Sequence, residues 1–132
     1  MRHRILIVDD EEAIVFAMHD YFERVGFEVD SACQKDQALS LLQTRGCYSV
    51  AVIDLQLTTC APAEGLELLA LVKQLCPATR TMILTAYASP EARIQVQRLG
   101  ADALLQKSQS LGQVLDVVRS LLGSEHGVER KH

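Results

Sequence analysis

Short apolar runs alternate with longer amphipathic stretches along the whole chain. Three of the apolar runs are nearly continuous in hydrophobic residues, which is typical of strands buried on both faces, as in a parallel sheet. The five segments predicted as strands are 4–8 (RILIV), 27–31 (FEVDS), 48–53 (YSVAVI), 80–84 (RTMIL) and 101–105 (ADALL).

The segments between these runs carry the spacing of amphipathic helices. The first stripe is followed by Gly26 and the second by Gly46, and glycine is a common residue just past a helix end. The stripes of the first three predicted helices are Ile14, Met18, Tyr21, Phe22 and Val25; then Ala38, Leu41 and Leu42; then Leu66, Leu69 and Leu75.

The last two predicted helices have recognisable ends. Ser89 is placed as an N-cap with Pro90 at the first helical position, and Gly100 follows the end. The final helix spans 111–122, and Ser110 with Gln113 has the spacing of a capping box.

Five strands that alternate with five helices predict one α/β domain, a doubly wound (βα)5 unit with a five-stranded parallel sheet and right-handed crossovers. The domain covers residues 1–122. Residues 123–132 (GSEHGVERKH) are polar and lack periodicity, so they are predicted to be a tail or the start of a linker.

Composition narrows the function classes. The 132 residues are 48% hydrophobic and 23% charged, which is ordinary for a soluble domain, and the net charge is −4. Without a block of lysine or arginine, this domain is not expected to bind nucleic acid directly. The apolar run near the N-terminus is only ILIV before two acids, too short for a signal peptide or a membrane span, so we expect a cytoplasmic protein without membrane contact.

The four cysteines show no metal or redox spacing. Cys33, Cys47, Cys60 and Cys76 form no CxxC pair and no Cys/His ligand pattern. The expectation is four reduced cysteines that bind no zinc and form no redox pair.

Residues with reactive or metal-binding side chains follow the predicted strands. In an open parallel sheet, sites form beyond the carboxyl ends of the strands. Those ends supply Asp9 and Asp10, Asp54, Thr85, and Lys107. Three neighbouring carboxylates repel one another and favour a divalent cation, and oxygen ligands suit Mg²⁺ beside a phosphate. An aspartate can attack phosphorus to form an acyl phosphate, while a metal, a lysine and a hydroxyl neutralise and position the transferred group.

In this order, the motifs ILIVDDEE, VIDLQL, ILTAYAS and GADALLQKS make residues 3–122 similar to the receiver domain of bacterial two-component response regulators. The resemblance implies a flavodoxin-like fold and a histidine kinase or phosphotransfer protein that donates a phosphoryl group to Asp54. It further implies that Asp10, Asp54 and the backbone carbonyl of Gln56 hold Mg²⁺, with Asp9 acting through water. Thr85 and Lys107 would contact the phosphoryl group.

Phosphorylation adds a charge of roughly −1.5 to −2. This charge would shift the equilibrium between two conformations of the surface formed by the fourth helix, fifth strand and fifth helix. A homodimer through that surface is an option that the sequence leaves open, and the downstream effector is unidentified. The family likeness implies a switch with at most weak autophosphatase activity rather than an enzyme.

Three positions depart from the usual family pattern. Ser108 stands where a proline is usual, which bears on whether the Lys107–Ser108 bond is cis. Leu104 aligns with the aromatic residue that commonly reports switching. Gly65 lies eleven residues after Asp54, so the loop 58–63 (TTCAPA) holds about three extra residues, an insertion that costs little closure entropy.

Other functions remain open at this point. A receiver-like module that signals through protein contacts without phosphorylation is the main alternative. A phosphohydrolase with an aspartate nucleophile would need a second acid where Gln56 stands. A nucleotide-binding protein would need a glycine-rich turn after the first strand, where this chain has VDDEEA.

Overall fold

The structure is a computed structural model that describes residues 3–55, 64–87, 89–107 and 110–130, with side chains described as far as residue 123. Strands and helices alternate from one end to the other. The elements are β1 (Arg4–Val8), α1 (Glu12–Arg24), β2 (Glu28–Ala32), α2 (Lys35–Arg45), β3 (Val50–Asp54), α3 (Glu64–Leu75), β4 (Arg80–Thr85), α4 (Pro90–Arg98), β5 (Ala103–Gln106) and α5 (Leu111–Arg130).

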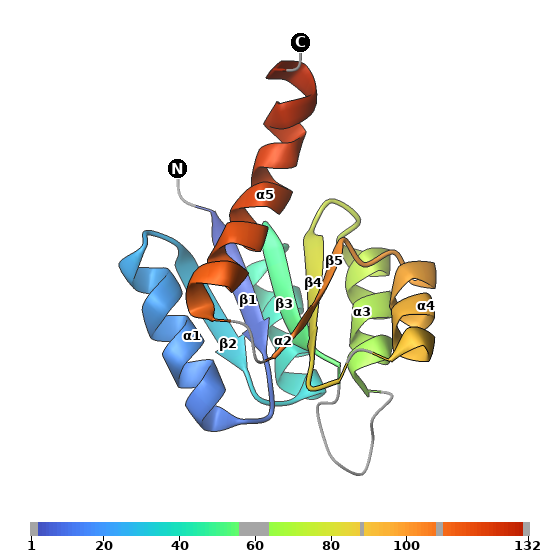
Figure 1. Cartoon of the computed structure of the whole chain (residues 1–132). Coiled ribbons are helices and arrows are strands. Elements are labelled where there is room, and N and C mark those ends of the chain that lie inside the picture. The colour runs from blue at the N-terminus through green and yellow to red at the C-terminus, as the bar shows by residue number, and fades with distance from the viewer. Residues whose placement is uncertain (1–2, 56–63, 88, 108–109, 131–132) are drawn as a thin grey trace.

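The five strands form one parallel sheet in the order β2-β1-β3-β4-β5. Helices cover both faces of it (Figure 1). Residues of β1 and β3 alternate between two cores: Ile5 and Val52 pack with α1 and α5, whereas Leu6 and Ile53 pack with α2, α3 and α4. The period of two places one side chain on each face in turn. The predicted doubly wound, flavodoxin-like fold is therefore confirmed.

The bounds of β1 are as predicted, and those of the other four strands differ from the predicted ones by one or two residues, because pairing with neighbours decides where a strand ends. The consequence matters for β3 and β4. Asp54 is the last residue of β3 and Thr85 the last residue of β4, so both side chains stand on the rim of the sheet itself.

Most helix ends are as predicted. Gly26, Gly46 and Gly100 all have positive φ values past their helices. The Ser89 hydroxyl accepts a hydrogen bond from the Ala92 amide, and Ser110 and Gln113 exchange the two bonds of a capping box. α5 continues through Arg130, beyond the expected end at Leu122, because 123–130 contains no proline and each added residue extends the hydrogen-bonded helix.

The predicted buried stripe of α3 needs correction. Leu75 is exposed and Leu66 only half-buried, while Gly65, Leu68, Leu69 and Val72 are the buried positions. The helix is apolar on most of its surface, so periodicity alone did not identify the face that meets the sheet.

The expectation of four reduced cysteines is wrong for one pair. Cys47 and Cys76 form a disulfide with their Cα atoms 5.7 Å apart. Cys33 is free and Cys60 lies outside the described residues. The bonded cysteines precede β3 and β4, which are neighbours in the sheet and begin at the same edge. Sequence spacing did not reveal that proximity.

Across the ranges that the structure describes, no helix is both long enough and apolar enough to cross a bilayer.

Candidate functional site

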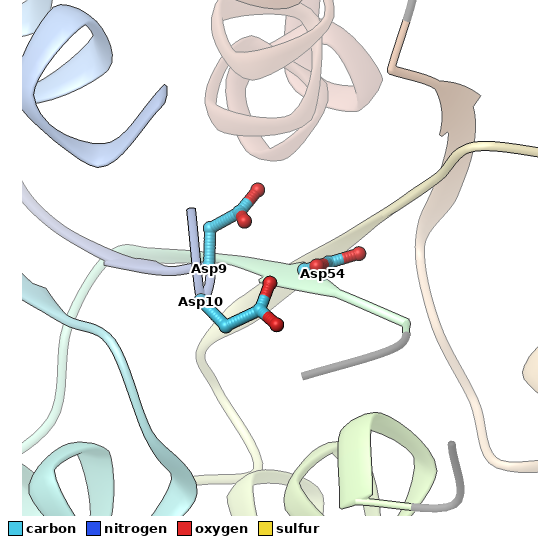
Figure 2. A group of neighbouring side chains, drawn as sticks. All are labelled: Asp9, Asp10 and Asp54. Atoms are coloured by element: carbon cyan, nitrogen blue, oxygen red, sulfur yellow. The ribbon is translucent and has the colours of Figure 1, made fainter. Parts of the chain in front are cut away.

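The three predicted carboxylates meet at the carboxyl edge of the sheet. Asp9 and Asp10 follow β1 and Asp54 ends β3, and oxygen atoms of the three side chains lie within 4.8 Å of one another (Figure 2). Parallel neighbours β1 and β3 end side by side, which brings together residues 44 positions apart in the chain.

Two of the acids are buried. Asp9 is 1% exposed and Asp54 4% exposed, whereas Asp10 faces solvent. The Asp9 Oδ1 atom accepts a hydrogen bond of 2.9 Å from the Glu11 amide. Burial raises the pKa of Asp9; the Glu11 amide and Lys107 oppose this rise without cancelling it. The carboxylate pair is thus costly to keep charged without a cation.

Lys107 supplies one such cation. Its Nζ atom lies 3.1 Å from Asp9 Oδ2, 2.7 Å from Glu11 Oε1 and 3.4 Å from Asp54 Oδ2. Burial alone would lower the pKa of Lys107, but the Glu11 hydrogen bond and the charges of Asp54 and Asp9 outweigh it and raise the pKa. Lys107 therefore stays protonated at neutral pH. Glu11 was not predicted; its place in the acidic run DDEE was the available signal.

Thr85 is buried on the same rim, but its hydroxyl is engaged locally. Oγ1 donates to the Tyr87 carbonyl at 3.2 Å and accepts from the Tyr87 amide at 3.3 Å. Tyr87 itself is 73% exposed. In this state the Thr85 hydroxyl is hydrogen-bonded to the backbone of the loop after β4 rather than to the carboxylate cluster.

Gly65 has a role that the sequence did not disclose. It lies in the first turn of α3, and a Cβ atom there would overlap the Leu55 carbonyl and lie 2.6 Å from the Asp54 carbonyl oxygen. Only glycine allows the helix to approach the backbone of Asp54 so closely. The start of α3 therefore abuts the residue at the centre of the site.

The site residues fit a bound divalent cation. Asp9 Oδ2 is buried and accepts no hydrogen bond from any part of the chain that the structure describes, although Lys107 lies near it as an ion pair. α1 begins after Glu11 without a side-chain cap, so Asp10 is not used as a helix cap. Three hard oxygen donors with spare coordination suit Mg²⁺ or Ca²⁺ better than a softer metal.

Several predicted features lie outside the described residues. These are the Gln56 carbonyl, the loop 58–63, and Ser108 with its preceding peptide bond. Leu104, one of the three departures from the family pattern noted in the sequence, is half-buried on β5.

Comparison with known proteins agrees with this geometry. Residues 5–119 match the family model described as the response regulator receiver domain. The chain is 34% identical over 104 residues to the alginate biosynthesis transcriptional regulatory protein AlgB of Pseudomonas aeruginosa, covering 79% of this chain and 22% of that protein. It is 26% identical to sporulation initiation phosphotransferase F of Bacillus subtilis, covering 92% of this chain and 95% of that one.

Solved structures give the same result. A receiver domain protein (CheY-like) from Methanospirillum hungatei superposes with a TM-score of 0.87 at 29% identity, covering 96% of this chain and 98% of that chain. A Burkholderia pseudomallei response regulator was solved with a phosphorylated aspartic acid and a calcium ion. It has a TM-score of 0.80 at 30% identity, and the match covers 97% of this chain and 75% of that chain. The chain spans about a quarter of the length of relatives such as AlgB and the Pseudomonas aeruginosa response regulator PilR. It belongs to the response regulator receiver domain family of bacterial two-component systems, the regulatory switches of phosphorelay signalling.

Proposed function

We propose that Asp54 accepts a phosphoryl group from a histidine kinase or a phosphotransfer protein, with Mg²⁺ held by Asp10, Asp54 and the Gln56 carbonyl and with Asp9 acting through water. The observation that carries this proposal is the cluster of Asp9, Asp10 and Asp54 within 4.8 Å, with the Lys107 ammonium beside it. When bound, Mg²⁺ supplies positive charge that draws the phosphoryl oxygens and the acceptor together.

The transfer forms one bond and breaks another. A carboxylate oxygen of Asp54 attacks phosphorus, and the bond from phosphorus to the donor's imidazole nitrogen breaks, which leaves an acyl phosphate on Asp54. Lys107 lies 3.4 Å from Asp54 Oδ2 and is positioned to neutralise charge on the incoming phosphoryl oxygens. Burial of Asp54 keeps most water away from the product, so hydrolysis by the chain itself stays slow and the domain acts as a switch.

Thr85 is the proposed moving part. To reach a phosphoryl oxygen, its hydroxyl must release the Tyr87 carbonyl. A neutral hydrogen bond contributes about 0.5–1.5 kcal/mol and one to a charged group about 1.5–3 kcal/mol, so phosphorylation favours the exchange. The loop that carries Tyr87 then loses its anchor, and the change reaches the surface of α4, β5 and α5 as a shift between two states.

The wider role follows from the family. We propose that residues 1–122 work as the receiver unit in the cytoplasm, that residues 123–132 are a tail or linker, and that the phosphorylated surface binds a protein effector or a second copy of the chain. Direct nucleic-acid binding by this domain and membrane contact are not part of the proposal.

A small phosphodonor tests the acceptor. With Mg²⁺ and acetyl phosphate, intact-mass spectrometry of the wild type should show one added phosphoryl group, and Asp54→Asn should show none. Asp116→Asn, at an exposed acid on α5, is the matched control and should be phosphorylated like the wild type. An unmodified wild type would favour the phosphorylation-independent module instead; an adduct that persists in Asp54→Asn would refute the acceptor assignment.

A further inference from the structure

The Cys47–Cys76 disulfide lies at the end of the sheet opposite the carboxylate cluster. Cys47 stands in the connection between α2 and β3, and Cys76 follows the last residue of α3. β3 runs from this edge to Asp54, so the length of a five-residue strand, about 17 Å, lies between the edge with the disulfide and the acceptor.

The bond closes a loop that contains β3 and α3, and the start of β4 lies next to it. Around it, Thr79 donates a buried hydrogen bond of 2.6 Å to the Tyr48 carbonyl, and the Arg80 amide donates to the Ser49 carbonyl at 3.0 Å. One end of α3 is tied by Cys76 to the chain before β3. The other end, at Gly65, is pressed against the backbone of Asp54 and Leu55.

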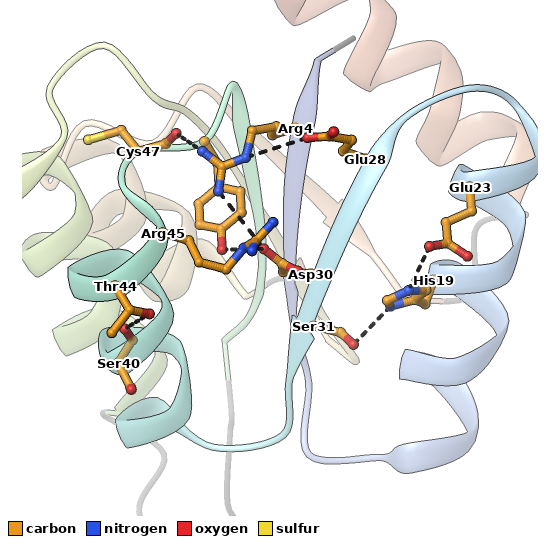
Figure 3. A network of polar contacts seen from close by, with 11 residues as sticks. Arg4, His19, Glu23, Glu28, Asp30, Ser31, Ser40, Thr44, Arg45 and Cys47 are labelled. Atoms are coloured by element: carbon orange, nitrogen blue, oxygen red, sulfur yellow. Dashed lines mark hydrogen bonds and ion pairs between the residues drawn. The ribbon is translucent and has the colours of Figure 1, made fainter.

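The neighbourhood of Cys47 adds a polar network (Figure 3). The Arg4 guanidinium donates a 3.0 Å hydrogen bond to the Cys47 carbonyl and stacks over the Tyr48 ring at 4.4 Å. The Tyr48 hydroxyl in turn donates to Asp30 at 2.7 Å. The connection that carries Cys47 is therefore held in place by contacts that do not depend on the disulfide, which keeps its sulfur near Cys76.

The two cysteine residues differ in exposure. Cys47 is exposed, whereas Cys76 is 4% exposed. A surface cavity of about 360 Å³, lined in part by both cysteines, His3 and Pro77, opens at this place. A small thiol in solution can reach this cavity, and because Cys47 is the more exposed residue of the pair, we expect the thiol to attack it.

We propose that Cys47 and Cys76 form a reversible dithiol–disulfide site that exchanges with low-molecular-weight thiols of the glutathione type. In reduction, a thiolate attacks Cys47 Sγ, breaks the Cys47–Cys76 bond and releases the Cys76 thiolate. A second thiolate attacks the external sulfur of the mixed disulfide, which releases the oxidised small molecule and the Cys47 thiolate. Both cysteines take up protons, and two electrons pass to the protein.

Reversibility follows from the placement of the bond. Disulfides in the cytoplasm, where we propose this protein acts, are usually transient or redox-sensing, and an exposed sulfur is the one that reacts. Oxidation closes a loop with a sequence separation of 29, which raises the stability of the folded state by restricting the unfolded chain. α3 connects the disulfide to the backbone of Asp54. A change in the redox state of the surroundings is therefore expected to affect the end of α3 that contacts the acceptor.

The test uses the full chain with Cys33→Ser and Cys60→Ser, so that Cys47 and Cys76 are the cysteines that remain of the four. After equilibration in glutathione buffers from fully reduced to fully oxidised, alkylation and intact mass should follow a single two-electron transition within that range. The oxidised form should melt about 10 °C above the reduced form. Hydrogen exchange of residues 64–75 should be slower in the oxidised form.

The same background with Cys47→Ser is the control, and its melting temperature should not respond to glutathione. Two thiols throughout the buffer range, a disulfide that resists reduction until the protein unfolds, or equal melting temperatures in both states would each overturn the proposal. None of these readings depends on phosphorylation, so failure of this site is distinguishable from failure of Asp54 as acceptor.

Discussion

The close approach of Gly65 to the backbone at the end of β3 supports a sharp prediction. In Gly65→Ala, the added Cβ would overlap the Leu55 carbonyl and stand 2.6 Å from the Asp54 carbonyl oxygen, where ordinary contacts begin at 3.4 Å. Both obstacles are backbone atoms and cannot rotate away. The start of α3 and the end of β3 must therefore separate by about 0.8 Å or more.

The size of the effect follows from this overlap. Overpacking a buried position typically costs about 1–3 kcal/mol, and each kcal/mol shifts the melting temperature of a domain this size by roughly 3–6 °C. We expect Gly65→Ala to melt roughly 3–18 °C below the wild type. A displacement near 1 Å at a reacting group can slow a reaction about a hundredfold, so the initial rate of phosphorylation by acetyl phosphate should fall by at least about tenfold.

The assay pairs a thermal melt with time-resolved intact-mass spectrometry at one temperature where both proteins are folded. Gly112→Ala is the matched control, because a Cβ there meets its nearest neighbours among the described residues, Ser110 Oγ and Tyr21 Oη, only at 3.9 Å. It should leave both readings unchanged or raise the melting temperature slightly, since alanine favours helices. If Gly65→Ala behaved like Gly112→Ala, the claim that α3 is fitted to the acceptor backbone would be refuted.

Three further predictions concern charge. Mg²⁺ at ten times its Kd should stabilise the wild type by about 1.4 kcal/mol. Asp9→Asn should lose this stabilisation, and the control Asp116→Asn should keep it. If Mg²⁺ stabilised Asp9→Asn as much as the wild type, Asp9 would not belong to the metal site. Lys107→Met should lower stability without Mg²⁺ by about 1–3 kcal/mol, because buried Asp9 and Asp54 lose their cation. Lys35→Met, which breaks a solvent-exposed pair with Glu67, should lose much less stability, and equal losses in the two variants would contradict the account. Burial, with the hydrogen bond to Asp30, raises the pKa of Tyr48 to about 12, so the stability that Tyr48 contributes is complete below the unfolded pKa of about 10 and is lost as pH rises through 12. Tyrosinate absorbance should therefore show one tyrosine that ionises near pH 12. If this transition persisted in Tyr48→Phe, another group would be its cause.

The sequence predicted the architecture and the rim of the site for a physical reason. Strands such as 48–53 are apolar on both faces, which few other environments tolerate, and parallel strands deliver whatever follows them to one edge. Asp9, Asp10, Asp54 and Lys107 could therefore be brought together without coordinates.

Features that depend on close packing could not be predicted in this way. The contact of Gly65 with the Asp54 carbonyl depends on how closely a helix approaches a strand, and the local hydrogen bonds of Thr85 depend on how the chain turns after β4. The cysteine pair was missed because spacing along the chain, 29 residues, carries no information about two connections that meet only when β3 and β4 pair.

The identity of the acceptor is the central claim, and one measurement addresses it most directly. An acyl phosphate, unlike a free carboxylate, is reduced by borohydride to an alcohol, so a phosphorylated aspartate becomes homoserine. After treatment with Mg²⁺ and acetyl phosphate followed by borohydride, peptide mapping should find homoserine at position 54 and aspartate at positions 9 and 10. Homoserine at position 9 or 10, or at none of the three in a protein that carries the phosphoryl mass, would contradict the account.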